Sequence, residues 1–315
     1  VQNFEPDEYD NFVDDVPIEN VASLNNYVYS SRLYYKFDYD SQQLDSQLYA
    51  IDRVVQSSTS TSSTNNTNGM NSLLDNSDFY RVNGNGSDGI VRITASFSNG
   101  DILLTTGFIV DDHVIPTCAH GLFLDNNGDK LLTLDELPCS LVIETFDENG
   151  YPAISGNAQV TLTPKEVHIP RPFVDPRVEG LTVDDYRYFD YALVSVEENL
   201  SSYSHFYLGT PSAANTVNFR QIDLFASGSA SNLVYTCVGN ATTANTVATP
   251  SVLKYSCPTV GGFSGCPIYV AYDYTTGSVT SRLNCVMAVH SSNTLGVTMD
   301  DRLRKFYLGN TEIGY

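Results

Sequence analysis

The feature that most constrains the fold is a series of short apolar runs, separated by turn residues, that begins near residue 88. In the first run, residues 90–97 alternate apolar and polar side chains, residues 98–101 (Ser-Asn-Gly-Asp) make a turn, and residues 102–110 form a second run. A period of two puts every second side chain on one face, which is typical of a half-buried strand. Further runs cover residues 141–146, 158–162, 191–196, 222–226, 233–238, 267–272 and 285–290. Since helical periodicity is almost absent, the sequence predicts an all-β fold, either a sandwich or a pair of barrels.

Two segments near the N-terminus depart from this strand pattern. Residues 1–56 are acidic and aromatic, and within them residues 44–55 are compatible with a helix or a strand. Residues 57–72 carry Ser, Thr or Asn at 14 of 16 positions. A stretch this polar cannot bury enough apolar surface to offset the entropy of ordering it, so it is predicted to be a flexible linker.

One helix is predicted, near the end of the chain, over about residues 300–308. Asp300 or Asp301 is a suitable N-cap, and Gly309 is a suitable end. The apolar face of this helix consists of Leu303, Phe306 and Tyr307.

The charge balance excludes several kinds of partner. The chain has 16 Lys and Arg residues against 37 Asp and Glu, a formal net charge of −21 at pH 7. Neutralising phosphates requires clustered basic side chains, so nucleic acids and anionic membrane surfaces are disfavoured as partners. No apolar run approaches the roughly 20 residues of a spanning helix, so we expect no membrane insertion. The composition is typical of β-rich extracellular proteins, and we expect a secreted monomer.

The six cysteines form an even set, which is compatible with three disulfides. Order along the chain suggests the pairs Cys118–Cys139, Cys237–Cys257 and Cys266–Cys285. The alternative is that several of these cysteines are reduced and buried, where a thiol behaves as a small apolar side chain.

Three short motifs carry residue types used in acyl transfer. Thr-Cys-Ala-His ends at His120, Asp190 stands at the entry to an apolar run, and Ser264 lies in Gly-Gly-Phe-Ser-Gly-Cys-Pro. Glycines on both sides of a serine permit a tight turn that exposes its hydroxyl and directs nearby N–H groups at one point. A lone histidine or a carboxylate at a strand edge is more often structural, so the glycine-flanked serine is the specific signal.

Together the three residues predict nucleophilic catalysis. A serine hydroxyl is a weak nucleophile near pH 7 and needs an imidazole base, which in turn needs a carboxylate to fix its tautomer. The chain order His120, Asp190, Ser264 is that of the chymotrypsin-type proteases rather than of the subtilisin or α/β-hydrolase types. The motifs resemble those of the trypsin-like serine peptidases. Thr-Cys-Ala-His is similar to their Thr-Ala-Ala-His, Asp-Tyr-Ala-Leu to their Asp-Ile-Ala-Leu, and Gly-Phe-Ser-Gly-Cys-Pro to their Gly-Asp-Ser-Gly-Gly-Pro.

This resemblance covers about residues 82–315 and implies a fold and a division of roles. The fold would be two antiparallel six-stranded β-barrels, about 82–200 and about 201–300, with the active site between them and a C-terminal helix after them. Ser264 would attack the peptide bond, His120 would move the proton, and Asp190 would orient the imidazole. The N–H groups of Gly262 and Ser264 would form the oxyanion hole. Substrates would be proteins or peptides, and the chemistry would require no cofactor.

The same resemblance bears on specificity. In this family the residue six before the nucleophile lies at the base of the S1 pocket, and here it is Pro258, so the carboxylate that selects Arg or Lys is missing. Thr259 and His290 are similar to the pair with which the glutamyl endopeptidases hold the carboxylate of a P1 glutamate. An imidazole and a hydroxyl suit a carboxylate in a partly desolvated pocket. Ser291 and Asn293 complete the predicted pocket. Asn293 and the serine before it differ from the usual Trp-Gly or Gly-Gly, so another P1 preference stays open.

Activation is predicted to involve the N-terminal extension. In trypsin a new N-terminal ammonium pairs with an Asp just before the catalytic serine, but here that residue is Phe263. The glutamyl endopeptidases instead bring the mature N-terminal amine towards the S1 pocket. Arg81-Val82, after the linker, resembles a processing site. Our hypothesis is that residues 1–81 are the propeptide of a zymogen and that Val82 is the mature N-terminus. The alternative is a permanent extension.

A calcium-binding loop is predicted just beyond His120. Residues 125–136 follow the spacing of an EF-hand loop, with Lys130 at the sixth position, where the pattern requires glycine. A lysine at positive φ would be strained by about 1 kcal/mol. The candidate ligands are Asp125, Asn127, Asp129, Leu131, Thr133 and Glu136. The alternative is a solvated acidic loop without a structural Ca²⁺.

The sequence therefore predicts a secreted serine endopeptidase that prefers Glu, or Asp, at P1. Two alternatives stay open. One is a trypsin-like protease with another P1 preference. The other is a non-catalytic binding or adhesin-like domain on the protease scaffold, with the acidic N-terminal segment as its contact surface.

Overall fold

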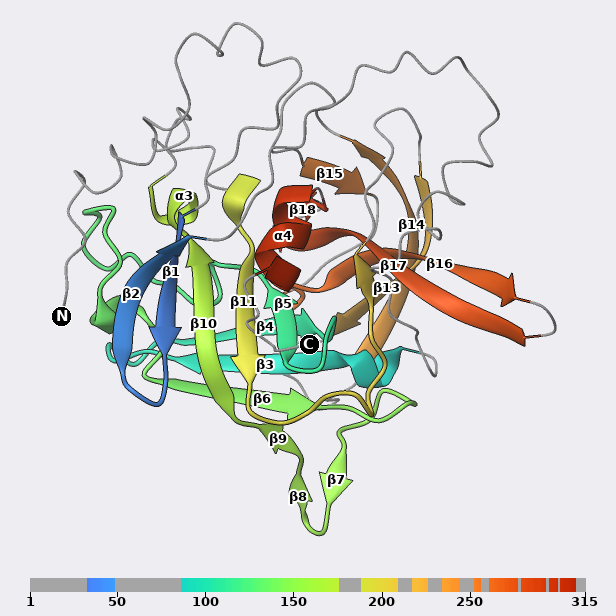
Figure 1. Cartoon of the computed structure of the whole chain (residues 1–315), viewed down its shortest axis with the longest axis horizontal. Helices are drawn as coiled ribbons and strands as arrows, with labels where there is room; N and C mark the ends of the chain where they lie inside the picture. The colour runs from blue at the N-terminus through green and yellow to red at the C-terminus, as the bar shows by residue number, and fades with distance from the viewer. Residues whose placement is uncertain are drawn as a thin grey trace, which may run out of the picture.

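The described part of the protein consists mainly of antiparallel β-sheet, as the computed structural model shows (Figure 1). The structure describes residues 33–48, 86–175, 188–208, 217–225, 234–243, 252–255, 261–276, 279–292, 295–299 and 301–309. The all-β prediction is confirmed. Among the described residues, no helix combines the length and apolarity needed to cross a membrane.

The first half of the fold consists of two sheets that pack against each other. One sheet has the order β4 (Ile102–Phe108), β3 (Ile90–Ser96), β6 (Ser140–Thr145), β9 (Thr161–Leu162). The other has the order β2 (Gln43–Leu48), β1 (Leu33–Asp38), β10 (Pro164–Pro170), β11 (Ala192–Val196), β5 (Val114–Thr117). The sheets meet where β4 contacts β5 and where β6 contacts β10. A separate small hairpin pairs β7 (Ile154–Ser155) with β8 (Ala158–Gln159).

Alternation along the strands explains how these sheets enclose a core. In β3 the side chains of Val91, Ile93 and Ala95 are fully buried, while those of Arg92 and Thr94 between them are partly exposed. One face of the strand therefore supplies the core, as the period of two predicts.

The second half is a ring of six strands. In sheet order these are β17 (Val279–Ser292), β16 (Pro267–Thr276), β13 (Val217–Phe225), β14 (Val234–Thr243), β15 (Val252–Tyr255) and β18 (Leu295–Thr298). Because β18 also pairs with β17, the ring closes, which removes the exposed edges of an open sheet. The short strand β12 (Tyr207–Leu208) adds to β17 in parallel.

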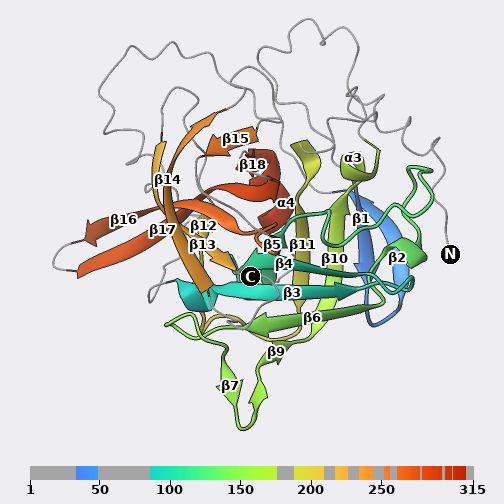
Figure 2. The ribbon, with the colours of Figure 1, turned by 180° about the vertical axis from the view of Figure 1, so that it is seen from behind.

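The predicted C-terminal helix is present as α4 (Asp301–Gly309). Its residues Leu303, Phe306 and Tyr307 are fully buried, and the ring of Tyr191 meets the edges of both aromatic rings, at centroid distances of 5.0 and 6.3 Å. Figures 1 and 2 show α4 beside β5 and β11, against the first half of the fold. Short helical elements elsewhere in the described chain include η2 (Ser87–Gly89), η3 (Leu134–Glu136) and α3 (Arg171–Val174).

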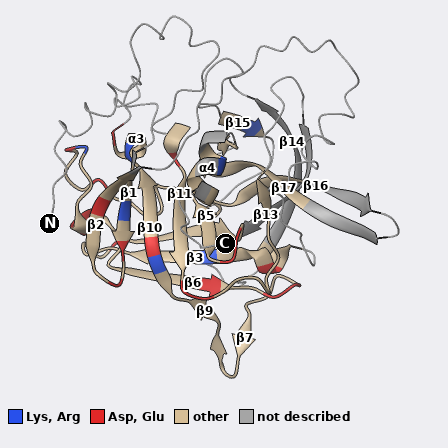
Figure 3. Cartoon of the chain, in the orientation of Figure 1, with Lys and Arg blue, Asp and Glu red and all other residues tan. Residues whose placement is uncertain are grey.

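Part of the predicted N-terminal extension lies inside this architecture. β1 and β2 form a hairpin whose first strand pairs with β10 over five residues, so the hairpin widens a sheet of the first half. Four of its apolar side chains are buried in the same core as the rest: Tyr34, Tyr35, Phe37 and Leu44. The Tyr34 ring stacks on His168 and meets the edge of Phe306. Both signs of charge occur on β1 and β10 (Figure 3), where the Lys36 ammonium lies 3.3 Å from the Glu166 carboxylate.

The disulfide predictions are wrong where the structure describes the cysteines. Cys118 and Cys139 carry free thiols, and Cys139 directs its sulfur to the carbonyl oxygen of Ser96 rather than to Cys118. Cys285 is likewise a free, buried thiol, so the Cys266–Cys285 bridge is absent. Burial raises the pKa of the Cys285 thiol to about 12, which keeps it protonated. The alternative of reduced, buried cysteines is correct for Cys118 and Cys285, whereas Cys139 is reduced but exposed. The Cys237–Cys257 pair lies outside the described side chains.

Candidate active site

Two strands that pair in the first half bring His120 and Asp190 together. β5 and β11 run antiparallel with Thr117 opposite Ala192, so the residues just after β5 lie beside those just before β11. His120 follows β5 by three residues, and Asp190 precedes β11 by two. Sheet register therefore places side by side two residues separated by 70 positions in the chain.

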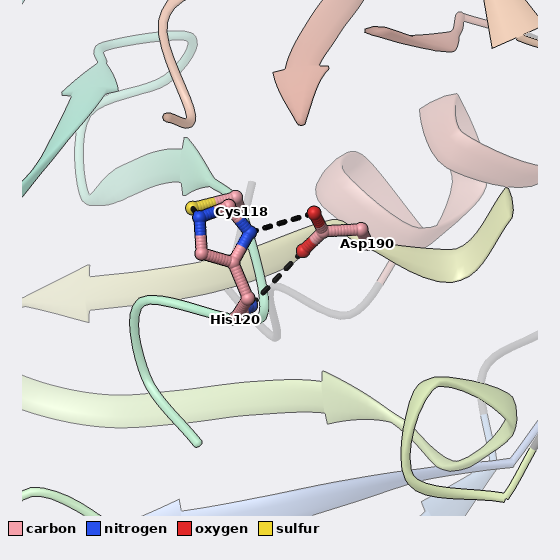
Figure 4. A group of neighbouring side chains, drawn as sticks. All are labelled: Cys118, His120 and Asp190. Atoms are coloured by element: carbon pink, nitrogen blue, oxygen red, sulfur yellow. Dashed lines mark hydrogen bonds and ion pairs between the residues drawn. The ribbon is translucent and has the colours of Figure 1, made fainter. Parts of the chain in front are cut away.

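The contact between these two residues is direct (Figure 4). The Nδ1 atom of His120 lies 2.7 Å from Oδ2 of Asp190. The backbone N–H groups of Ala119 and His120 donate to Oδ1 of the same carboxylate at 3.0 and 2.9 Å. These bonds hold the imidazole so that Nε2 is turned away from the carboxylate.

Asp190 is fully buried, yet the structure keeps it charged. The Ser291 hydroxyl also donates to Oδ2, so both carboxylate oxygens accept hydrogen bonds. Burial would raise the pKa of Asp190, but the His120 charge and the donated hydrogen bonds lower it further than burial raises it. Burial would likewise lower the pKa of His120, but the Asp190 carboxylate raises it well above 6.5. Each group therefore stabilises the charged form of the other.

The loop that carries Ser264 is held tightly between β4 and β17. Gly262 and Gly265 have φ of 94° and 85°, in the left-handed region that favours glycine. A Cβ on Gly265 would lie 2.3 Å from the carbonyl oxygen of Thr106, so glycine is required there for close approach as well. Thr106 donates its backbone N–H to Ser264 O at 2.8 Å and its hydroxyl to Gly262 O at 2.7 Å. The Gly265 N–H donates to His290 O at 2.7 Å.

Ser291 connects this loop to the His120–Asp190 pair. The Ser264 hydroxyl donates to the carbonyl oxygen of Ser291 at 3.4 Å, while the Ser291 hydroxyl donates to Asp190. The three predicted residues thus gather at one place, but the Ser264 hydroxyl bonds to Ser291 and not to His120. Ser291 was predicted to line the substrate pocket; in the structure its hydroxyl supports the buried carboxylate of Asp190.

Cys118, which was predicted to pair with Cys139, lies instead at the imidazole of His120. Its Sγ atom lies beside the imidazole of His120 (Figure 4), 3.7 Å from Nε2, and the residue is fully buried. The signal was available in Thr-Cys-Ala-His, where the cysteine replaces an alanine of the family motif beside the histidine.

Of the other predicted pocket residues, the structure describes His290. It is buried, and its Nδ1 hydrogen-bonds with the hydroxyl of Tyr255. Burial, reinforced by the charge of His120, lowers the pKa of His290 to about 4, so this imidazole is neutral at pH 7. Thr259 and Asn293 lie outside the described residues, as do Arg81 and Val82 of the predicted processing site.

The predicted calcium loop gathers its acidic residues. Carboxylate oxygens of Asp125, Asp129 and Glu136 lie within 4.8 Å of one another. Lys130 has φ of 66°, the positive value expected for the sixth position. Its ammonium lies 3.3 Å from Asp125, where it neutralises part of the acidic charge. Glu136 is buried and accepts the backbone N–H groups of Asn126 and Thr133 at 3.2 and 3.1 Å, and together with Thr133 it forms a capping box for η3.

Two of the other predicted ligands use their oxygen atoms within the loop. Asn127 Oδ1 accepts the backbone N–H of Asp129 at 2.8 Å, and the Thr133 hydroxyl bonds to Asp135 and Glu136. The oxygen-rich donor set suits a hard cation, and Lys130 competes with such an ion for Asp125.

Comparison with known proteins finds similarity in structure alone. No protein-family model and no curated protein matches the chain. A thermostable serine protease, AL20, from an extremophilic microorganism matches with a TM-score of 0.44 at 16% identity, over 70% of this chain and 95% of its own. A Glu endopeptidase in complex with MPD matches with a TM-score of 0.49 at 12% identity, over 72% of this chain and 93% of its own. The protease Anisep from Arthrobacter nicotinovorans matches with a TM-score of 0.45 at 14% identity, over 72% of this chain and 97% of its own.

Proposed function

We propose that the protein is a serine endopeptidase that works through Ser264, His120 and Asp190. The observation that carries the proposal is the fixed imidazole: Nδ1 is hydrogen-bonded to a buried carboxylate, and Ser291 links the glycine-flanked Ser264 to that same carboxylate. That arrangement supplies a base whose tautomer and orientation are set in advance. We further propose that the protein is secreted, as its composition and chemistry favour.

The proposed reaction begins with rotation of the Ser264 side chain from the Ser291 carbonyl to Nε2 of His120. The serine oxygen then bonds to the carbonyl carbon of the substrate while its proton passes to Nε2. The resulting imidazolium lies against the Asp190 carboxylate, which stabilises its charge. Nε2 next gives that proton to the leaving amine as the C–N bond breaks. Water hydrolyses the acyl-enzyme by the same proton path.

Two amides support the proposed oxyanion hole. Among the described residues, the backbone N–H groups of Gly262 and Ser264 have no hydrogen-bond acceptor. The constrained loop holds both on one short turn, so they can donate to the oxygen of a tetrahedral intermediate without reorganisation.

For specificity we propose a preference for Glu, or Asp, at P1, with Thr259 and His290 as the residues that bind its carboxylate. His290 is neutral in the free protein, and Tyr255 occupies its Nδ1. A carboxylate in the pocket would favour the charged imidazolium, so substrate binding would be coupled to proton uptake by His290. We expect the preference for Glu over Gln to weaken as the pH rises.

The experiment that tests this function is the mapping of cleavage sites by mass spectrometry. The full chain and its Ser264→Ala variant are each incubated with an unstructured protein mixture, with and without prior nicking at Arg81. Cuts that only the wild type makes, clustered after Glu, would support both the catalytic residues and the pocket. Cuts after other residues would support the proposed catalytic residues and contradict the proposed pocket for Glu. No cuts from nicked wild type would favour the non-catalytic binding domain.

We also propose that activation involves cleavage between Arg81 and Val82. Since β1 pairs with β10 over five residues and buries aromatic side chains, the segment that contains residues 33–48 would stay attached after cleavage. N-terminal sequencing of the active form should find two chains, one that begins at Val82. A single N-terminus at residue 1 would show that the extension is permanent.

We also propose that residues 125–136 bind Ca²⁺, which would stabilise this loop and take no part in the peptidase reaction. The gathered carboxylates of Asp125, Asp129 and Glu136 support it, and Lys130 limits the affinity. Isothermal titration with Ca²⁺ tests it directly, and no binding at millimolar levels would dismiss it.

A further inference from the structure

The Cys118 thiol occupies a position that the proposed reaction does not use. Its sulfur lies 3.7 Å from Nε2 of His120, the nitrogen that must exchange protons with Ser264. Asp190 is bonded to the other ring nitrogen, so the thiol and the carboxylate contact the imidazole through different atoms (Figure 4). Ligand atoms of all three residues lie within 4.8 Å of one another.

The spacing of the sulfur and Nε2 suits two ligands of one metal ion. In tetrahedral zinc sites the Zn–S bond is about 2.3 Å and the Zn–N bond about 2.0 Å, which puts the two ligand atoms about 3.5 Å apart. The observed separation of 3.7 Å is close to this value, so both atoms could bind one ion with little movement of either side chain.

The surroundings of His120 also match those of a metal-binding histidine. Such a histidine usually donates its second ring N–H to a carboxylate, which fixes the tautomer and makes the ligand nitrogen more basic. Asp190 does this here at 2.7 Å, and Ser291 and two backbone N–H groups hold the carboxylate in turn. The same support that prepares Nε2 as a base therefore prepares it as a ligand.

The chemistry of the pair selects the type of ion. Thiolate and imidazole ligands favour Zn²⁺ and similar borderline or soft ions, whereas the oxygen donors of residues 125–136 favour hard ions such as Ca²⁺. The side chain of His120 is 38% exposed, so the imidazole can be reached from solvent although the thiol is buried.

We propose that Cys118 Sγ and His120 Nε2 form a binding site for Zn²⁺ or a related divalent ion, and that the bound ion inhibits the peptidase. Binding releases the thiol proton to solvent, and the metal–sulfur and metal–nitrogen bonds replace two of the ion's water ligands. The metal occupies the lone pair of Nε2, so His120 can no longer accept the proton of Ser264. The inhibitory part rests on the proposed function, whereas metal binding itself does not.

Direct binding is tested with Co²⁺, which serves as a spectroscopic substitute for Zn²⁺. A cysteine ligand produces a sulfur-to-cobalt charge-transfer absorption, which requires no enzymatic activity. The full chain should bind one equivalent with this absorption and lose the cobalt when Zn²⁺ is added. Cys118→Ser and Cys118→Ala should abolish the absorption, and the matched control Cys139→Ser, which removes an exposed thiol elsewhere, should retain it. Circular dichroism establishes that each variant is folded.

Inhibition is measured as the ratio of peptidase rates with and without Zn²⁺, within each variant. Loss of one supporting carboxylate around a metal-binding histidine costs about 10–100-fold in affinity, so loss of the Cys118 ligand should raise the half-inhibitory Zn²⁺ concentration by about 100-fold or more. The Cys139→Ser control should respond like the wild type.

The outcomes separate the two proposals. Cobalt absorption that depends on Cys118 in a chain without peptidase activity would retain the metal site and reject the proposed function. An active peptidase whose cobalt absorption and Zn²⁺ inhibition are the same in Cys118→Ser as in the wild type would overturn the metal site and leave the function standing. Absorption that is lost in Cys139→Ser instead would assign the metal to another thiol and also overturn the site.

Discussion

Replacing Phe37 by alanine tests whether the N-terminal hairpin is part of the folded domain. Phe37 lies in β1, opposite Val167 of β10 and Leu44 of β2, and all three side chains are buried in one continuous core. Its ring meets the edge of the Tyr39 ring at a centroid distance of 4.8 Å. The alanine variant would leave a cavity between the hairpin and the sheet of the first half.

The expected loss of stability follows from the apolar area that Phe37 buries and from the cavity that the substitution leaves. A buried phenylalanine removes about 200 Å² from water, which at about 25 cal/mol per Å² is about 5 kcal/mol as an upper bound. Measured Phe→Ala changes in cores cost about 3–5 kcal/mol, with the cavity included. We expect the free energy of unfolding to fall by about 3–5 kcal/mol. For a domain of this size each kcal/mol lowers the melting temperature by about 2–4 °C, so a decrease of about 10 °C is expected.

The assay is thermal unfolding of the full chain, followed by circular dichroism. The matched control is Gln43→Ala in the same hairpin, where an exposed side chain is removed and the change should stay within about 0.5 kcal/mol. The reasoning would be refuted if the two variants melted at the same temperature. It would also fail if amide hydrogen exchange showed the hairpin of the wild type to be unprotected while the rest of the domain stayed protected.

Three further predictions concern the site and its surroundings. Asp190→Asn should lower kcat by about 10⁴-fold with little change in KM, because an amide at that position favours the wrong tautomer of His120; steady-state kinetics on a peptide substrate measures this. Lys130→Gly should relieve about 1 kcal/mol of backbone strain and remove a competing cation, so calorimetry should find tighter Ca²⁺ binding. The hydrogen bond from His168, with further help from Lys36, lowers the pKa of Glu166 to about 2. Its charged form therefore stabilises the fold at neutral pH, and about 1–2 kcal/mol of that stability, after allowance for solvent screening, should be lost as the pH falls from about 4.5 towards 2.

Each of these has an outcome that would contradict it. Equal kcat values for wild type and Asp190→Asn would remove the orienting role of the carboxylate. Unchanged or weaker Ca²⁺ binding by Lys130→Gly would show that the loop does not use the sixth position as assumed. A Glu166→Gln variant that loses stability between pH 4.5 and 2 as steeply as the wild type would assign the acid sensitivity to other groups.

Strands with alternation or with an apolar run after a turn could be predicted, and those with neither could not. β3 alternates, β4 is such an apolar run, and both lie where the sequence predicted them. β10 was missed because Pro164–Pro170 begins and ends with proline and contains Lys, Glu and His, although its last four residues are buried between β1 and β11. β1 was assigned to the acidic extension because its aromatic residues alternate with charged ones beside many acidic neighbours. Its burial depends on β10, a partner more than 100 positions away in the chain.

The sequence by itself determined the residue types of the site and the local backbone they require. His120, Asp190 and Ser264 were identified from short motifs, and Gly262 has the positive φ expected beside a nucleophile. These features are local, since a few neighbouring residues decide whether a turn can form.

Only the tertiary structure decided which of these groups meet. The contact of His120 with Asp190 depends on the register of β5 against β11, and the position of Ser264 on hydrogen bonds to β4 and β17. The same holds for Cys118, whose sulfur lies at Nε2 instead of in the predicted disulfide. Pairing between distant strands fixes which side chains face each other, and no local pattern specifies which strands will pair or in which register.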